Sequence, residues 1–233
     1  MLTINYRYFS IQPNDIVVDV GCGEGRHIID AAIRYPIYAL GLDLSQKDLQ
    51  VAQQKMHDCH LFAPLSQASF QQADATRLPF ADNSIDKIIC SEVLEHIPNY
   101  EGVLAELMRV LKPEGLLAIS VPRYWPEKIC WVLSEAYHQV EGGHIRIFNK
   151  NRLKKEIGAQ GFQLTQTHYA HALHSPYWWL RCLFWKTQDT NPLVKIVHRV
   201  LVWDLMNKPW ITRMLEAALN PVLGKSVVMY FRK

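Results

Sequence analysis

The stretch Ile16-Val17-Val18-Asp19-Val20-Gly21-Cys22-Gly23-Glu24-Gly25 decides the fold of this 233-residue chain. It begins with a β-branched run that is typical of a strand, and residues 26–34, which follow it, have a helical pattern. Three alternating glycines between strand and helix permit a tight turn and let the backbone come within contact distance of a ligand. The stretch therefore predicts a ligand-binding strand–turn–helix unit.

The acidic residue before the glycines indicates which ligand this turn accepts. A dinucleotide fingerprint has the form G-x-G-x-x-G and receives a pyrophosphate, whereas the pattern here is D-x-G-x-G-x-G. A carboxylate at Asp19 would repel phosphate but suits a ligand that carries an ammonium group. The pattern favours an amino-acid-bearing nucleoside such as S-adenosylmethionine.

A second acidic residue stands where such a ligand needs it. Residues 37–43 form an expected strand that ends in Asp43, 22 positions after Gly21. A doubly wound α/β domain places the carboxylate that binds ribose hydroxyls at about this distance. Taken singly, the glycines could form a plain tight turn and Asp43 a helix cap, but together they predict a nucleoside site.

Composition describes a folded protein and excludes several classes. The chain is 49% hydrophobic and 20% charged, as in a globular protein, and a net charge of +3 is too small to favour nucleic acid as a partner. Five cysteines without C-x-x-C spacing indicate reduced thiols and a cytoplasmic location. We find no pattern of a signal peptide or of a membrane-spanning helix. Composition leaves open whether the protein is a monomer or a homodimer.

Strand-like runs alternate with helical patterns along most of the chain. The expected strands are 16–20, 37–43, 69–73, 85–91, 116–121, 162–168 and 226–231, and the expected helices are 26–34, 45–58, 100–111 and 149–160. Apolar strands such as 116–121 are typical of a parallel sheet covered on both faces. We predict an α/β fold: a Rossmann-like, seven-stranded, mostly parallel sheet with helices on both faces and a helical insertion between the last two strands.

Five motifs follow one another in roughly residues 15–121. They are residues 17–25, Gly41-Leu42-Asp43-Leu44-Ser45, Ala73-Asp74-Ala75 with Leu78-Pro79-Phe80, residues 80–90 leading into Ser91-Glu92-Val93-Leu94-Glu95-His96-Ile97, and Arg109-Val110-Leu111-Lys112-Pro113-Glu114-Gly115. As a set they resemble the class I S-adenosylmethionine-dependent methyltransferases of the broad type 11 group, which includes quinone-biosynthesis methyltransferases. The match weakens after Val121, where such enzymes place their substrate-reading parts.

The resemblance implies a role for each residue of the cofactor site. It implies that Asp43 accepts hydrogen bonds from both ribose hydroxyls, that Asp74 accepts one from the adenine amino group, and that the Ala75 amide donates to a ring nitrogen. Leu44 would pack on the adenine, and Ser91 would end the fourth strand beside the methyl group. The glycine turn contributes Asp19, Gly21, Cys22, Gly23 and Gly25. The simpler alternatives are a loop-capping carboxylate at Asp74 and a plain core residue at Leu44.

Two histidines are candidates for a general base, which methyl transfer needs when the acceptor holds a proton tightly, as a hydroxyl does. His96 would lie on a helix after the fourth strand, and His144 lies in Gly142-Gly143-His144-Ile145-Arg146. Glu92 is a less favoured third candidate. Each histidine could instead be a buried side chain satisfied by a backbone carbonyl.

The same segment raises the question of a metal. Glu92, Glu95 and His96 would share one face of the expected helix, since they are spaced i, i+3 and i+4. A similar E-x-x-E-H segment holds a divalent cation in some ubiquinone-pathway O-methyltransferases and small-RNA 2′-O-methyltransferases, and such ligands suit a divalent ion. Much the same string is common in relatives that use no metal, so we predict no metal ligand here.

About fifty residues, 172–223, separate the last two expected strands, which usually form a close hairpin in this fold. Five of the seven tryptophans lie there, with six basic and three acidic residues. An amphipathic stripe follows: Trp210, Ile211, Met214, Leu215, Ala218 and Leu219. Aromatic, basic, amphipathic helices suit a membrane interface or a lipophilic substrate, and a lid, a separate subdomain or a dimer contact are the alternatives.

We divide the chain into a methyltransferase domain, 1–171 with 224–233, and this inserted segment, 172–223. We expect residues 125–139 to complete a lid together with the inserted segment.

The sequence thus predicts a methyltransferase that uses S-adenosylmethionine and acts on a small molecule, with a lipid-like or quinone-like acceptor favoured. Peripheral membrane contact stays open. Two rivals are a methyltransferase-like scaffold or regulator without turnover and an NAD-dependent dehydrogenase. Asp19, Asp43 and Asp74 argue against the first, and the glycine spacing argues against the second.

Overall fold

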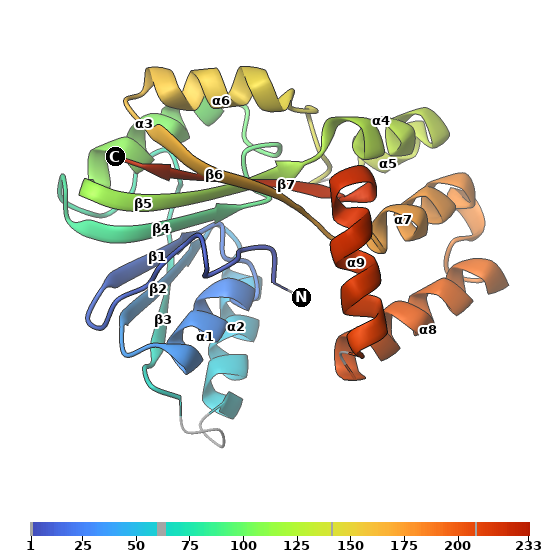
Figure 1. The fold of residues 1–233 in the computed structure, drawn as a ribbon, viewed down its shortest axis with the longest axis horizontal. Coiled ribbons are helices and arrows are strands. Elements are labelled where there is room, and N and C mark those ends of the chain that lie inside the picture. Colours follow the sequence, from blue (N-terminus) through green and yellow to red (C-terminus); the bar gives the residue numbers. More distant parts are fainter. Residues whose placement is uncertain (1, 60–63, 141, 208) are drawn as a thin grey trace.

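Seven strands form one sheet that runs through the molecule in the order β3-β2-β1-β4-β5-β7-β6 (Figure 1). The computed structural model describes residues 2–59, 64–140, 142–207 and 209–233. The strands are β1 Ile16–Val20, β2 Tyr38–Asp43, β3 Ala68–Gln72, β4 Ile85–Ser91, β5 Leu111–Pro122, β6 Gln163–Ala170 and β7 Ser226–Arg232. Neighbouring strands from β3 to β5 are parallel, and β7 is antiparallel to β5 and to β6. The predicted α/β class and mostly parallel sheet are confirmed.

Helices cover both faces of this sheet. The helices are α1 Arg26–Arg34, α2 Gln46–Asp58, α3 Tyr100–Val110, α4 Tyr124–Leu133, α5 Glu135–Gln139, α6 Lys150–Ala159, α7 His174–Leu183, α8 Pro192–Asn207 and α9 Trp210–Leu223, with a 3-10 turn η2 at Trp185–Thr187. Side chains of α1, α2 and the N-terminal segment form one apolar layer with the sheet, and side chains of α3 and α6 form the other.

Strand β7 contributes side chains to the apolar layers on both faces of the sheet. Val227, Met229 and Phe231 belong to the layer under α3 and α6, whereas Val228 and Tyr230 belong to the layer under α1. All five are buried, because successive side chains of a strand point to opposite faces. A sheet covered on both sides therefore needs the near-continuous apolar strands that the sequence contains.

Two local predictions need correction. The strand expected at 116–121 begins earlier, at Leu111, and its ladder with β4 shifts from the pair Ile85–Leu111 to the pair Lys87–Leu116. The helix expected directly after β4 is absent from the described residues 92–98, and α3 begins only at Tyr100. The physical reason is a left-handed residue at the end of β4, Glu92, with φ 58°.

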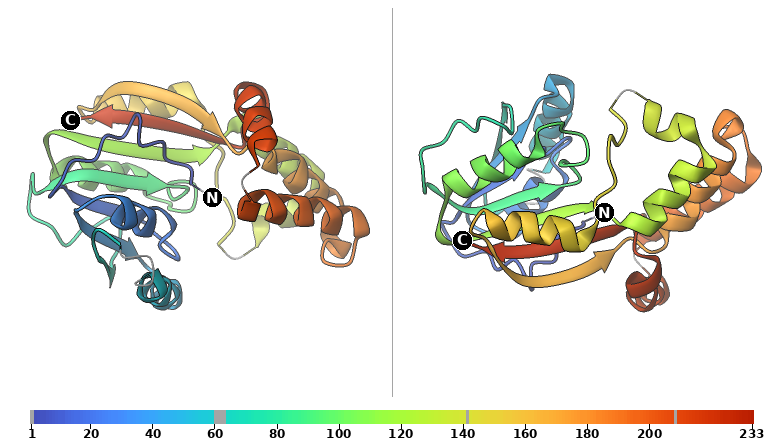
Figure 2. Two further views of the ribbon diagram at one scale, coloured as in Figure 1. Left: turned by 60° about the horizontal axis from the view of Figure 1, so that its bottom comes forward. Right: turned by 90° about the horizontal axis from the view of Figure 1, so that it is seen from above.

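The segment between β6 and β7 forms a helical layer beyond the carboxyl edge of the sheet (Figures 1 and 2). Helix α7 packs against α4, and their shared core contains Cys130, Tyr137 and Cys182 with four partly buried tryptophans around them. Among the described residues, no helix is both long enough and apolar enough to cross a bilayer. The helical insertion predicted between the last two strands is therefore present and is attached to the sheet domain through α4.

Candidate active site

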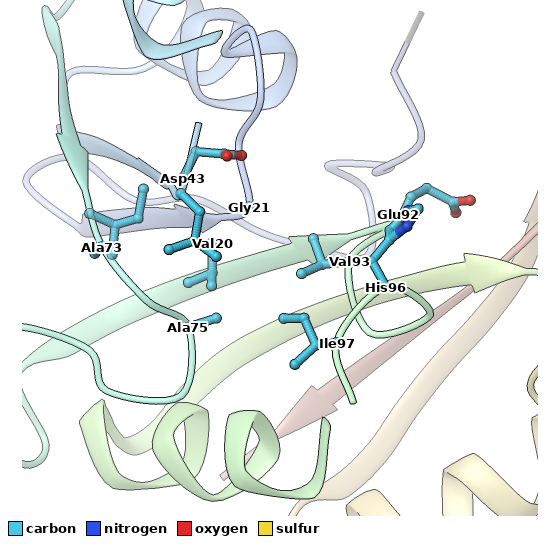
Figure 3. A pocket seen from close by; sticks show the side chains of 11 residues that line it. Val20, Gly21, Asp43, Ala73, Ala75, Glu92, Val93, His96 and Ile97 are labelled. Atoms are coloured by element: carbon cyan, nitrogen blue, oxygen red, sulfur yellow. The ribbon is translucent and has the colours of Figure 1, made fainter. Parts of the chain in front are cut away.

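Four segments meet at one pocket at the carboxyl edge of the sheet: the glycine turn after β1, the end of β2, the segment after β3 and the turn after β4 (Figure 3). The pocket is a cleft of about 220 Å³ that opens to solvent. Its lining residues are Val20, Gly21, Leu42, Asp43, Leu44, Ala73, Ala75, Glu92, Val93, His96 and Ile97. The strand order changes direction between β1 and β4, which is where open α/β sheets bind ligands.

The glycine turn is held tightly against the turn after β4. The amides of Gly21 and Cys22 both donate to the carbonyl of Leu42, at 2.7 and 2.9 Å. Gly21 has φ 72°, and a Cβ added there would lie 2.4 Å from Cγ2 of Val93. Only glycine fits this position, since a side chain would both strain the backbone and push the two turns apart.

Asp43 is fixed by the backbone before any ligand arrives. Its Oδ2 accepts a hydrogen bond from the Gly23 amide at 2.7 Å, and its Oδ1 accepts one from the Ser45 amide at 2.8 Å. Ser45 in turn caps α2 by accepting from the Asp48 amide at 3.2 Å. Each carboxylate oxygen keeps a free lone pair, so the group can accept two further hydrogen bonds from a diol.

Asp19 belongs to β1 and does not line the pocket, although its neighbour Val20 does. It is 1% exposed, and neither carboxylate oxygen has a hydrogen-bond partner among the described residues. Burial raises the pKa of Asp19 to about 7, against the opposing charge of Arg26. An unpaired buried carboxyl is costly and marks a place where a cation or a donor belongs.

The remaining predicted cofactor residues divide into two groups. Leu44 and Ala75 line the pocket, and Leu44 is 62% exposed there. Cys22, Gly23, Gly25, Asp74 and Ser91 are not among its lining residues. The carboxylate of Asp74 accepts from the amide and the hydroxyl of Thr76, both at 2.8 Å, which lowers the pKa of Asp74. In this state Asp74 makes the loop-capping contacts of the simpler alternative, and its role toward adenine stays a prediction.

A chain of hydroxyls positions Glu92 at the pocket. Ser120, on β5, donates from Oγ to Oε1 of Glu92 at 2.9 Å, and the Oγ atoms of Ser91 and Ser120 lie 2.8 Å apart. Because the Ser120 hydroxyl donates its single proton to Glu92, the hydrogen bond between the two serines must be donated by Ser91. Ser91 therefore acts through Ser120 on Glu92, and sequence reasoning missed Ser120 because it lies in an apolar strand.

Arg146 ties the turn after β4 to the loop that carries His144. Its guanidinium donates to the carbonyls of Leu94, Ile97 and Pro98. The same two segments also meet where Nδ1 of His96 lies 3.2 Å from the carbonyl of Gly143. Consequently the two histidine rings, 48 positions apart in the sequence, lie with their centroids 4.9 Å apart.

His144 is oriented by a buried carboxylate on α4. Its Nδ1 lies 2.6 Å from Oε1 of Glu127, which is 1% exposed and also accepts from the Trp131 indole at 3.2 Å and the Tyr137 hydroxyl at 3.4 Å. Burial works to raise the pKa of Glu127, but the hydrogen bond and charge of His144 and the charge of Lys225 outweigh it and keep that pKa low. Nε2 of His144 remains as the atom available for a substrate. Glu127 was missed because Trp125-Pro126-Glu127 matches no motif.

Glu95 completes a cluster with the two histidines. It is fully buried, and neither of its oxygens has a partner among the described residues. Burial, with repulsion from Glu92, raises its pKa well above the ordinary range. One ligand atom each from Glu95, His96 and His144 fits within 4.8 Å of one another, which is the donor set for a divalent ion. The expected grouping of Glu92 with Glu95 and His96 on one helix face is wrong, since no helix forms there.

Comparisons with known proteins agree on the first half of the chain. The family model described as "Methyltransferase domain" matches residues 18–119. Methyltransferase GfsG of Streptomyces halstedii is 35% identical over 115 residues, 49% of this chain and 40% of that protein. The sterol 24-C-methyltransferase of Eremothecium gossypii is 32% identical over 137 residues, 59% of this chain and 34% of that protein. The chain thus spans well under half the length of these relatives.

Solved structures extend the likeness to the whole fold. A putative methyltransferase from Bacillus halodurans superposes with a TM-score of 0.63 and 22% identity, over 96% of this chain and 94% of that chain. The [4+2]-cyclase SpnF superposes with a TM-score of 0.65 and 19% identity, over 98% of this chain and 78% of that chain. At these identities the likeness shows the fold alone, and the reaction must be argued from the site.

The glycine turn gives a first prediction. Gly21→Ala should lower the free energy of unfolding and abolish the pocket, because the added Cβ meets Val93 at a left-handed residue. Gly158→Ala is the matched control: it lies on the exposed side of α6 with nothing within 4 Å of the new Cβ, and should raise the free energy of unfolding by about 1 kcal/mol. Urea denaturation of both variants checks this, and equal stability of the two would contradict the close contact.

The unpaired Asp19 gives a second prediction, on ligand-free protein. Because the folded-state pKa of about 7 lies above the ordinary 3.8, ionising Asp19 destabilises the fold as the pH rises through that window. Asp19→Asn should raise the melting temperature by several degrees at pH 8 and by less at pH 5, since each pKa unit corresponds to about 1.4 kcal/mol. Asp43→Asn should lower the melting temperature, because it disturbs two hydrogen bonds from backbone amides. A pH-independent effect of Asp19→Asn would refute the assignment.

Proposed function

We propose that this protein transfers a methyl group from S-adenosylmethionine to a small, lipophilic acceptor, since residues 18–119 match the family model of a methyltransferase domain and the relatives of that part are named as methyltransferases. The observation that carries the proposal is the pocket at the glycine turn, which is lined by the fixed carboxylate of Asp43. Asp19, at the end of β1 just before this turn, is buried, and its carboxylate oxygens have no hydrogen-bond partner among the described residues. His144 and Glu127 stand past the turn after β4, where an acceptor would approach.

The residues present fit the proposed cofactor. A diol is the natural partner for the free lone pairs of Asp43, and an ammonium group, directly or through a water, is the natural partner for Asp19. No atom of the structure lies within 4 Å of the place that a Cβ would take on Gly23, so the backbone there can approach a ligand closely. Bound S-adenosylmethionine would supply an electrophilic methyl group, and the protein then has to align the acceptor and exclude water.

On the acceptor side, His144 acts as the general base. Its Nδ1 proton is directed to Glu127, which leaves the Nε2 lone pair to take the proton of an acceptor hydroxyl. Bound S-adenosylmethionine would supply the methyl group and, with its sulfur–methyl bond broken, would leave as S-adenosylhomocysteine. The Glu127 carboxylate then stabilises the positive charge that develops on the imidazole. His96 lies beside His144 and lines the pocket, and it packs against the acceptor rather than accepting its proton.

Two observations support a lipophilic acceptor. The helices next to His144 carry an aromatic cluster in which Tyr137 lies 5.9 Å from Trp178 and 6.0 Å from Trp185, centroid to centroid. Relatives of the matched part of the chain are named as methyltransferases of sterols and of a rifamycin. Tyr137 also lies edge-on to His144, with 6.0 Å between the ring centroids, so an apolar acceptor at His144 would stand beside this aromatic cluster. The inserted helices would then act as the substrate-binding lid.

A partition experiment tests the acceptor class. Purified protein is incubated with methyl-labelled S-adenosylmethionine and an extract of its source cells, and the product is divided into organic, aqueous and protein fractions. We expect label in the organic phase. Label in the aqueous or protein fraction would exclude the lipophilic acceptor, and failure to bind S-adenosylhomocysteine would favour the rival without turnover.

The His144–Glu127 pair gives a third prediction. His144→Gln and Glu127→Gln should each lower kcat about 10²–10³-fold, within the usual contribution of a general base, and leave KM for S-adenosylmethionine unchanged. Tyr137→Phe is the control, because its hydroxyl lies 3.4 Å from Glu127 and supports it weakly. Full turnover by both glutamine variants would exclude the pair from the reaction.

Removing metal ions with a chelator distinguishes two mechanisms: acid–base catalysis by His144, and catalysis that needs a divalent cation bound by Glu95, His96 and His144. We expect protein treated with EDTA and desalted to keep its kcat. Loss of turnover that Mg²⁺ or Mn²⁺ restores would overturn this expectation and make the three side chains a metal site.

A further inference from the structure

Helix α9 carries its apolar side outward. Trp210, Ile211, Met214 and Val222 are 59–69% exposed, and none of its residues is buried. An amphipathic helix of a soluble domain normally turns this stripe toward the core. The stripe that the sequence analysis singled out is therefore present, but it lies on the opposite side of the helix from the rest of the protein.

The polar side of α9 is the side that attaches it. Asn220 accepts the Ala172 amide on Oδ1 at 3.0 Å, and its carbonyl accepts from Arg123. Glu216 is partly buried, with one oxygen 4.0 Å from Nδ1 of His171, and burial raises the pKa of Glu216. These contacts fix the orientation, so rotating the stripe inward would break them and bury Glu216 further.

Helix α8 adds a second outward stripe. Leu193, Ile196, Val200 and Trp203, spaced i, i+3, i+7 and i+10, are each 52–55% exposed, and Met206 is 76% exposed. Val194 and Leu201, on the other side, are the buried residues of the helix. Figures 1 and 2 show α8 at the end of the molecule away from the sheet, joined to α9.

The charged residues around the outward sides of α8 and α9 indicate which kind of partner this surface binds. Lys195 and Arg199 are exposed on the flank of the α8 stripe. The acidic residues of the two helices, Asp204 and Glu216, are partly buried and line a cleft against α1. The outward side is therefore apolar with a basic edge, and two tryptophans, Trp203 and Trp210, stand at the junction of the helices. Apolar residues, interfacial tryptophans and basic flanks together are the composition of a helix that lies in an anionic bilayer surface.

We propose that the outward sides of α8 and α9 dock this protein on an anionic lipid bilayer, with Trp203 and Trp210 at the headgroup level. We call this surface the docking face; it comprises Ile196, Val200, Trp203 and Met206 of α8 with Trp210, Ile211, Met214, Leu215 and Val222 of α9. The proposal deepens the proposed function and rests on it for one point, that the acceptor is dissolved in the bilayer. Docking would place the lid helices next to the lipid phase.

Vesicle flotation with the full chain tests the docking face without turnover. Vesicles of phosphatidylcholine alone, or with about a third phosphatidylglycerol, are used at low and high salt. We expect flotation with the anionic vesicles, weakened by salt. Ile211→Glu combined with Met214→Glu should reduce binding about tenfold or more. Tyr38→Glu, at a side chain that is 67% exposed on β2, is the control and should bind as the parent does.

Three results would overturn the proposal: no flotation of the parent, equal flotation of the double variant, or a stable dimer in light scattering that the double variant dissociates, which would make the face a dimer contact. A cooperative thermal unfolding transition of the double variant, followed by circular dichroism, shows that it folds. Turnover on an acceptor dispersed in detergent reports on the proposed function separately, so that either proposal can fail without the other.

Discussion

The close approach of Gly21 to Val93 is the constraint on which the rest of the site depends. It brings the end of β1 and the end of β4 together at the point where the strand order reverses. One side of this contact carries Asp43, held through the Gly23 amide. The other side carries Glu92 and His96. A larger residue at position 21 would separate the nucleoside side of the pocket from the side where an acceptor must stand.

Buried charge is distributed unevenly around this contact. Glu127 receives three donors and keeps a low pKa, as expected of a carboxylate that orients a histidine. Asp19 and Glu95 receive none from the described residues, and burial raises the pKa of each. Burying a carboxyl group without a partner costs free energy, and the binding of a ligand that donates to the group can offset this cost. The two unpaired groups lie near opposite ends of the proposed reaction path, one on the cofactor side and one beside the histidine cluster.

Predictions from the sequence were most accurate for features that depend only on residues close together in the chain. The glycine turn and the strand end at Asp43 are specified within a few residues of themselves, and both lie as predicted. Prediction was poorest where distant segments meet. Nothing near Glu127 reveals that it faces His144, since that contact depends on how α4 leaves β5 and on Arg146. The helix expected at Glu92 fails because hydrogen bonds from β5 hold Glu92 in a left-handed conformation. The outward stripe of α9 is visible as a pattern in sequence, but its direction is set by Asn220 and Glu216.

The most direct measurement compares two ligands for the unmodified protein by calorimetry at pH 8. S-adenosylhomocysteine carries the ribose, the adenine and the amino-acid end, whereas methylthioadenosine lacks the amino-acid end. If Asp19 is held unpaired for an ammonium group and Asp43 for the ribose, both ligands bind, and S-adenosylhomocysteine binds about tenfold or more tightly. Equal affinities, or binding of NADH in place of both, would contradict the assignment of this pocket to S-adenosylmethionine.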